Sequence, residues 1–374
     1  MGTRAGVPGR NNHKVTLSFL AATIWICCGV AGASESVPHK QMRYLMGALC
    51  EITAYPPGPN AEDQTAAALD AAFSELKRID ALLSNWKPDS ELMRLNAAAG
   101  SSSGTDGQRP AVTVSPELFA RLEMALRFAR LSGGRFDPTV GPLVRAWGFL
   151  PAQETGRAAV QAARQRVGWE KVRLDAEKRT VQFAVPGMEI DLGGMAKGYA
   201  AERAATVLRQ HGITAGLVSL GGSSMTAIGH PAGAAGWPVL VRDPRDGETP
   251  AAALELHDGE SLATSGTYEK TVGAGPARRS HILDPHSGEA LAGEMSVTLV
   301  MRDGEAADAL AKFFFFVPGL GSPESTNLLG NYPQASVMLL RLRGRDLVEE
   351  RAGAQPRRFR YYPGKLATHA AKTH

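Results

Sequence analysis

Helical and strand-like segments follow one another in this chain without the regular strand–helix–strand repeat of a parallel α/β sheet. Apolar residues recur at helical spacing in residues 61–83, 115–132, 197–211 and 305–316. Runs typical of strands cover residues 42–55, 172–184 (a hairpin), 215–229, 237–243, 252–257, 280–284, 295–302 and 335–343. This mixture predicts an α+β fold with mixed, largely antiparallel sheets and packed helices. No internal repeat and no hinge between two domains is evident in the sequence.

Local signals place some of the boundaries. Ser115 followed by Pro116 is typical of a helix N-cap and first turn. Gly212 suits the position just after a helix end. Residues 97–109 are polar and glycine-rich, which predicts a loop. The basic segment 346–374 is expected to be a loose tail.

The charge balance argues against a nucleic-acid groove. The net charge of +4 includes three basic residues and no acid within residues 1–33, and the remaining chain has 38 basic against 37 acidic residues. Nine of those basic residues lie between 341 and the C-terminus, so the main body is slightly acidic. We therefore expect no nucleic-acid partner for the body of the protein. Polyanion binding, or contact with a membrane surface, stays open for the basic tail alone.

The N-terminus is typical of a secretory signal peptide. Residues 15–33 are apolar, three basic residues precede them, and the run ends in Ala31-Gly32-Ala33. We expect residues 1–33 to be removed and the mature protein to be periplasmic. The alternative is an uncleaved membrane anchor, although the run is marginal for a span.

The three cysteines do not indicate a lipid anchor, a disulfide or a zinc site. Cys27 and Cys28 follow the bulky residues Ile24-Trp25-Ile26, which do not suit a lipoprotein signal. Cleavage after Ala33 leaves Cys50 as the one thiol, which excludes an internal disulfide and a cysteine-based zinc site. Cys50 lies in an apolar run and is expected to be buried.

Three glycine pairs could approach a ligand. In MEIDLGGMAKGY (188–199), an apolar strand is expected to deliver Asp191, and a helix opens near Lys197. Glycines before a helix N-terminus let backbone N–H groups approach a phosphate. The alternative is a tight turn with Lys197 solvated. With the pairs at 133–134 and 221–222, these turns would converge on an extended ligand.

Two later segments offer further polar groups. His281, in SHILDPHSG, is a candidate base or ligand contact, or a packed residue. Asp308 and Lys312, in ADALAK, lie one helical turn apart, which alone would give an ordinary ion pair. The run Phe313–Phe316 is expected to join the core.

Taken together, these motifs resemble the FAD:protein FMN transferase (ApbE) family over residues 40–343. They are LLSNWKPDSELMRLN (82–96), GGRFDPTVGPL (133–143), IDLGGMAKGYAAE (190–202), SLGG (219–222), ATSGTY (263–268), HILDPHSG (281–288) and ADALAK (307–312). The resemblance implies a single large domain that binds FAD, cleaves its pyrophosphate and transfers FMN to a Thr or Ser hydroxyl, with AMP as the leaving group. The acceptor would be a flavoprotein subunit of a membrane redox complex, and Mg²⁺ would assist.

The resemblance also implies site residues. Contacts with FAD would come from Met46, Trp86, Arg135, Phe136, Asp137, Asp191, Lys197, Thr264 and His281. The metal would be held by the Gly194 carbonyl and by Asp308. The catalytic residues would be His281, as the base, with Asp308 and Lys312.

Two positions depart from the family pattern. Lys312 replaces the usual Thr metal ligand, so that metal binding is weakened or the lysine itself stabilises phosphate charge. Ser223 replaces the usual acid or amide after the glycine pair. Two alternative functions stay open: an FAD pyrophosphatase that gives FMN and AMP, and a non-catalytic FAD-binding or carrier protein.

Overall fold

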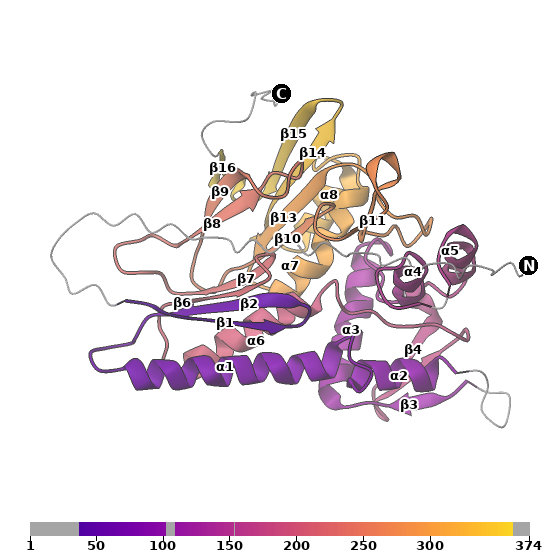
Figure 1. The fold of residues 1–374 in the computed structure, drawn as a ribbon, viewed down its shortest axis with the longest axis horizontal. Helices are drawn as coiled ribbons and strands as arrows, with labels where there is room; N and C mark the ends of the chain where they lie inside the picture. Colours follow the sequence, from indigo (N-terminus) through magenta and orange to yellow (C-terminus); the bar gives the residue numbers. More distant parts are fainter. Residues whose placement is uncertain (1–36, 102–108, 153, 362–374) are drawn as a thin grey trace, which may run out of the picture.

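An eight-stranded sheet forms the centre of the computed structural model, which describes residues 37–101, 109–152 and 154–361 (Figure 1). Its strands, in spatial order, are β1 (His39–Leu45), β2 (Ala48–Ala54), β6 (Gly216–Leu220), β7 (Ser224–Ile228), β10 (Ser261–Gly266), β13 (Met295–Met301), β14 (Ser336–Arg343) and β15 (Asp346–Gly353). Each strand pairs antiparallel with its neighbours. The expected α+β fold with largely antiparallel sheets is therefore confirmed.

Each face of this sheet packs into a core of its own, because successive side chains of a strand point to opposite faces. In β14, Val337 and Leu339 join the larger core, whereas Met338 and Leu340 join the second. The larger core lies under α1 (Glu62–Leu83), α6 (Ala196–Gln210) and α7 (Gly304–Ala311). The second core lies under a small sheet of β16 (Arg360–Tyr361), β9 (Pro250–Leu256) and β8 (Trp237–Arg242).

The remaining elements pack at the end of the molecule that carries α4 and α5 in Figure 1, or connect the sheet strands. The helices among them are α2 (Glu91–Ala99), α3 (Pro116–Leu131), α4 (Gly141–Ala146), α5 (Arg157–Arg164) and α8 (Pro323–Gly330). The strands are β3 (Ala111–Thr113), β4 (Val172–Asp175), β5 (Thr180–Phe183), β11 (Thr271–Val272) and β12 (Arg279–Ser280). As predicted, Ser115 caps α3, residues 172–184 form a hairpin, and Gly212, with φ +84°, follows α6.

Two segments that the sequence predicts as single strands are hairpins. Residues 42–55 divide into β1 and β2 at Met46-Gly47, where both residues have positive φ. Residues 215–229 divide into β6 and β7 at Gly221 and Gly222, with φ of +65° and +67°. Consecutive left-handed residues reverse the chain, and glycine adopts that conformation without steric cost.

Four further predictions need correction. Residues 188–192 form no strand, because the side chain of Asn96 bonds both backbone groups of Ile190, with 2.8 Å at each contact. Residues 280–284 contain only the end of β12. The predicted loop begins later than expected because α2 continues to Ala99, and residues 102–108 lie outside the described residues. The predicted helix 305–316 ends at Ala311 and continues as a 3₁₀ turn, in which Phe313–Phe315 are buried as expected.

The loose-tail prediction is wrong for residues 346–361. β15 pairs along its whole length with β14, and Phe359 is fully buried in the second core. Arg358 forms an ion pair with Glu260 at 2.6 Å. The apolar anchor and this ion pair hold a segment whose composition is basic. Residues 362–374 lie outside the described residues.

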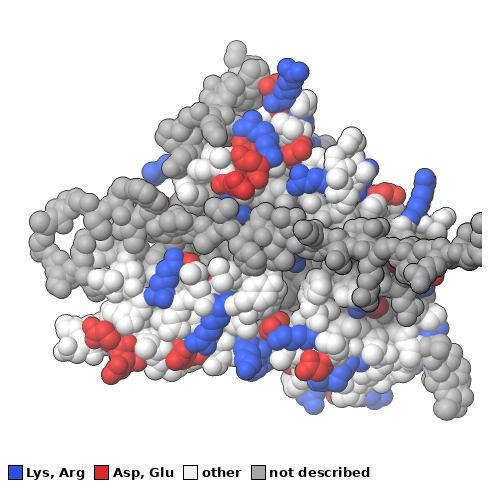
Figure 2. Space-filling model, viewed as in Figure 1, with Lys and Arg blue, Asp and Glu red and all other residues white. Residues whose placement is uncertain are grey.

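The predicted signal peptide, residues 1–33, also lies outside the described residues. Within the described ranges, no helix combines the length and the apolar character needed to cross a bilayer. Cys50 is fully buried, as expected, and burial raises the pKa of its thiol to about 11. On the face shown in Figure 2, the described Lys and Arg side chains are interspersed with Asp and Glu.

Candidate functional site

A cavity of about 890 Å³ opens between the edge of the large sheet, the start of α6, the end of α7 and the loops that precede α4. All twelve residues that the sequence predicts for the site line it: Met46, Trp86, Arg135, Phe136, Asp137, Asp191, Gly194, Lys197, Thr264, His281, Asp308 and Lys312. They come from segments up to 266 residues apart, so only the tertiary structure brings them together.

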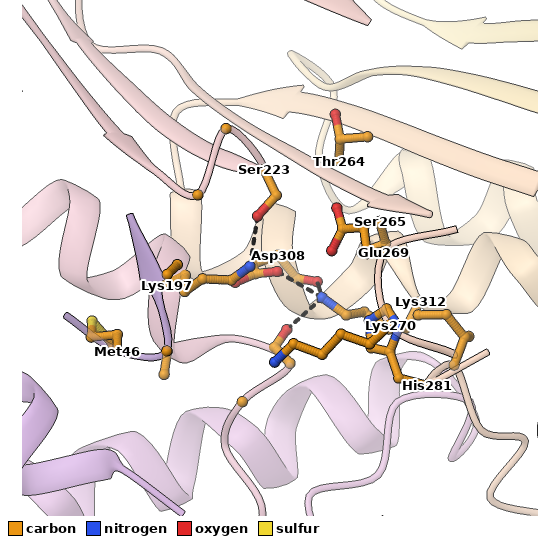
Figure 3. A pocket seen from close by; sticks show the side chains of 18 of the residues that line it. Met46, Lys197, Ser223, Thr264, Ser265, Glu269, Lys270, His281, Asp308 and Lys312 are labelled. Atoms are coloured by element: carbon orange, nitrogen blue, oxygen red, sulfur yellow. Dashed lines mark hydrogen bonds and ion pairs between the residues drawn. The ribbon is translucent and has the colours of Figure 1, made fainter. Parts of the chain in front are cut away.

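The ammonium group of Lys312 contacts the same oxygens of Gly194 and Asp308 that the resemblance assigns to a metal ion (Figure 3). Its Nζ donates to the carbonyl of Gly194 at 2.9 Å, to the carbonyl of Asp308 at 2.6 Å and to Oδ1 of Asp308 at 2.6 Å. Asp308 is 3% exposed. The pair is thus a buried, three-point contact and not the solvent-exposed ion pair of an isolated helix.

The position of Asp308 depends on a close approach of α6 and α7. Oδ2 of Asp308 accepts a hydrogen bond from the backbone N–H of Gly198 at 3.1 Å. A Cβ at Gly198 would lie 1.9 Å from the carbonyl oxygen of Gly304. Only glycine at this position allows the two helices to meet, and that contact fixes the carboxylate at the cavity wall.

Lys197 is half-buried, and its Nζ donates to Oγ of Ser223 at 2.6 Å (Figure 3). The alternative of a solvated Lys197 is therefore wrong. Ser223, which departs from the family pattern, follows the Gly221-Gly222 turn and orients this amine. Of the three glycine pairs, 193–194 and 221–222 line the cavity. The third, 133–134, does not line it, although Arg135 and the two residues after it do.

His281 is half-buried, and its Nδ1 is buried without a hydrogen-bond partner among the described residues. Desolvation lowers the pKa of His281 to about 3, and repulsion by Lys270, Lys197 and Lys312 adds to the effect. The imidazole is therefore neutral and has a free acceptor atom beside three amines.

Lys270 is a cavity residue that the sequence analysis missed. It is exposed towards the cavity, its Nζ lies 5.9 Å from the ring centre of Trp86, and its carbonyl accepts from the backbone N–H of His281 at 3.0 Å. Desolvation lowers the pKa of Lys270, with repulsion by Lys197 as a further cause. No motif marks this lysine; the β11–β12 pairing brings it opposite His281.

Some predicted contacts have structural partners of their own. Both carboxylate oxygens of Asp137 accept hydrogen bonds, from Thr139 at 2.6 and 2.7 Å and from the backbone of Trp169 at 3.0 Å. Asp191 accepts from the backbone of Gly193 at 2.7 Å. Both acids shape cavity loops, and desolvation raises the pKa of each.

Three other predicted residues form the cavity wall. Arg135 pairs with Asp284 at 3.1 Å. The ring of Phe136 packs against Gly194, where an added Cβ would lie 3.2 Å from it. The hydroxyl of Thr264 is 3.0 Å from that of Thr298 on the neighbouring strand. These contacts fix part of the cavity wall, which the three lysines, His281 and the exposed carboxylate of Glu269 also line.

The similarity to known proteins covers most of this chain. A model of the ApbE family matches residues 46–338. The chain belongs to the ApbE family. The FAD:protein FMN transferase of Treponema pallidum is 34% identical over 341 residues, which cover 86% of this chain and 90% of that protein. An FAD:protein FMN transferase of Klebsiella pneumoniae is 31% identical over 78% of this chain and 86% of its own length. Both relatives are named as transferases, which are enzymes, so this chain belongs to a family of enzymes.

Solved ApbE structures have the same fold. The ApbE protein of Thermotoga maritima aligns with a TM-score of 0.70 at 27% identity, covering 84% of this chain and 97% of that protein. The flavin transferase ApbE of Vibrio cholerae aligns with a TM-score of 0.69 at 24% identity, covering 85% and 98%. The match to almost the whole of both proteins agrees with the α+β architecture.

Proposed function

We propose that this ApbE-family protein transfers the FMN part of FAD to a Thr or Ser hydroxyl of an acceptor flavoprotein. The observation that carries the proposal is the group of three lysines, Lys197, Lys270 and Lys312, around a neutral His281 in one large cavity. A pyrophosphate is an anion that such amines attract, and its cleavage depends mostly on positioning and charge stabilisation.

The cavity has the groups that FAD would require. Its volume of about 890 Å³ is in the range of pockets that enclose extended ligands. Trp86, 56% exposed at the cavity wall, offers a face for a flavin or adenine ring. Met46, in the β1–β2 turn, offers a second apolar contact. The glycine pair at 193–194 brings the backbone close to Lys197 and Lys312, where the phosphates would bind.

The proposed reaction forms one bond and breaks one. The acceptor hydroxyl oxygen bonds to the FMN phosphorus, and the bond from that phosphorus to the bridging oxygen breaks, so that AMP leaves. His281 takes the hydroxyl proton, because its imidazole is neutral. Bound pyrophosphate would offset the repulsion from the three lysines and so raise the basicity of His281 when substrate is present.

Mg²⁺, which the resemblance implies, does not fit the residues present. The Gly194 and Asp308 oxygens that would bind it accept from the Lys312 ammonium. Within residues 37–101, 109–152 and 154–361, no three His, Cys, Asp or Glu residues group as a metal site. The proposed reaction therefore contains no step that needs a metal.

We also propose that the protein acts in the periplasm on a flavoprotein subunit of a membrane redox complex. The basic and apolar run before Ala33 supports export, and the family resemblance supports the acceptor class. N-terminal sequencing of the protein from periplasmic extract tests the export. A mature N-terminus at Ser34 is expected, and an intact Met1 would contradict cleavage.

The activity test uses the chain without residues 1–33, FAD and an acceptor flavoprotein domain with a Gly- and Thr-containing flavinylation motif. AMP release and the acceptor's mass are followed together, with the acceptor Thr→Ala variant as control. Equal amounts of AMP and of acceptor carrying FMN are expected. AMP without labelled acceptor would indicate a pyrophosphatase, and bound but intact FAD would indicate a carrier protein.

A further inference from the structure

We propose that the ammonium of Lys312 permanently takes the place of a divalent cation at the Gly194–Asp308 oxygens, so that this protein needs no metal. The part of this proposal that concerns turnover rests on the proposed flavin-transfer function. The part that concerns metal binding can be tested independently of that function.

The geometry satisfies all three donors of the ammonium. Nζ contacts three oxygens, from the Gly194 carbonyl, the Asp308 carbonyl and the Asp308 carboxylate, at 2.6 to 2.9 Å. A lysine has three N–H groups and no acceptor, so each donor has one oxygen. These oxygens come from the loop before α6 and from α7, and Lys312 joins the two elements as a bound cation would.

Few oxygen atoms at this position are left to bind a metal ion. Oδ2 of Asp308 already accepts from the Gly198 N–H at 3.1 Å and lies 3.5 Å from the hydroxyl of Ser224. Mg²⁺ requires near-octahedral oxygen ligands at about 2.1 Å. A metal here would have to displace the ammonium, leave a largely buried Lys312 without its carboxylate partner and face a second positive charge.

The charge that a metal would supply is available from the side chains. Asp308 offsets the charge of Lys312, and Lys197 and Lys270 add two amines whose fields reach His281 in the same cavity. These two amines would offset much of the negative charge of a pyrophosphate bound among them, although the carboxylate of Glu269 also lines the cavity and acts on Lys270. Lys312 holds the Gly194 loop in place, because its N–H groups are taken by the oxygens of Gly194 and Asp308.

The first test is metal binding without substrate. The mature chain is stripped with EDTA, dialysed and titrated with Mn²⁺ by electron paramagnetic resonance and with Mg²⁺ by calorimetry. Wild type is expected to bind neither ion at millimolar concentration. Lys312→Thr, which removes the ammonium and adds an oxygen, is expected to bind both. Asp308→Asn in the Lys312→Thr background should lose this binding, and Lys178→Thr on the surface should resemble wild type.

The second test is turnover with and without EDTA. Wild type is expected to release AMP at the same rate, within about twofold, in the presence and absence of EDTA. Lys312→Thr in EDTA should release AMP about 10²–10³-fold more slowly than wild type, and added Mg²⁺ should restore its rate. Stoichiometric Mn²⁺ binding by wild type that Asp308→Asn abolishes would overturn the proposal, as would loss of wild-type turnover in EDTA that Mg²⁺ restores. If wild type bound no metal and also released no AMP, the proposed function would fail while the replacement of the metal stood. The wild-type titration decides the matter even if a variant does not fold.

Discussion

The backbone N–H of Gly198 donates a 3.1 Å hydrogen bond to Oδ2 of Asp308, which lies 110 residues further along the chain. This bond joins the first turn of α6 to α7 at the cavity wall. It exists because Gly198 has no side chain to hold the helices apart. The packing of two helices and the geometry of the site are therefore one feature.

Gly198→Ala should destabilise the protein and impair the site together. The new Cβ would lie 1.9 Å from the Gly304 carbonyl oxygen, so that the helices must separate at a cost of about 1–3 kcal/mol or more. Thermal unfolding and flavin-fluorescence titration measure both effects. Gly330→Ala is the matched control, because its Cβ would meet no atom within 4 Å and stability should be unchanged or slightly higher. Equal stability of the two variants would show that the close approach is not required.

Asp308→Ala should lower both stability and transfer, because it leaves the Lys312 ammonium without its carboxylate partner. Breaking a buried pair costs about 3–5 kcal/mol, and transfer should fall at least about 10²-fold. Denaturant unfolding and AMP release give the two values. Combining Asp308→Asn with Lys312→Met removes both charges and should regain much of the stability without regaining transfer. A double variant as unstable as Asp308→Ala would argue against the charge pair as the cause.

The stability of the protein should fall as the pH decreases from about 6.5 towards 3, in part because of His281. Between these values the unfolded chain binds a proton on this residue, whereas the folded chain, in which the pKa is about 3, does not. His281→Gln cannot titrate, so its unfolding free energy should fall less over this range. Denaturant titrations at several pH values measure the difference. Parallel profiles for the two proteins would show that His281 is not held neutral.

Trp86→Ala should weaken FAD binding by about tenfold, because a stacked ring contributes about 0.5–1.5 kcal/mol beyond its buried area. The side chain is 56% exposed in the protein without ligand, so stability should change little. Trp86→Phe should retain most of the affinity. Quenching of flavin fluorescence measures binding, and unchanged affinity in Trp86→Ala would place the ring system elsewhere in the cavity.

Lys270→Met should reduce FAD affinity and make binding less sensitive to salt, since it removes one of the amines that attract the pyrophosphate. Lys77→Met changes an exposed lysine outside the cavity and serves as the control. Titrations at low and high ionic strength separate the two variants. An identical salt dependence for both would exclude Lys270 from the phosphate site.

Much of the molecule follows from short-range patterns. The capped start of α3 at Ser115 and the end of α6 before Gly212 are local features, because caps and left-handed glycines act within one turn of chain. The apolar periodicity of residues 61–83 likewise predicts α1 almost to the residue. The ordered motifs, read as a family resemblance, identify twelve residues that do meet in one cavity.

Only the tertiary structure decided how those residues are used. Lys270 carries no motif, and pairing between β11 and β12 brings it opposite His281. The sequence leaves open whether Lys312 weakens a metal site or supplies the charge, because the answer depends on the distance from its Nζ to the carbonyl of Gly194, 118 residues away. Burial of Phe359 likewise turns a basic tail into part of the fold. Local sequence determines helices, turns and residue types through short-range interactions, whereas contacts between distant segments set the charge partners, burial and pKa values of the site.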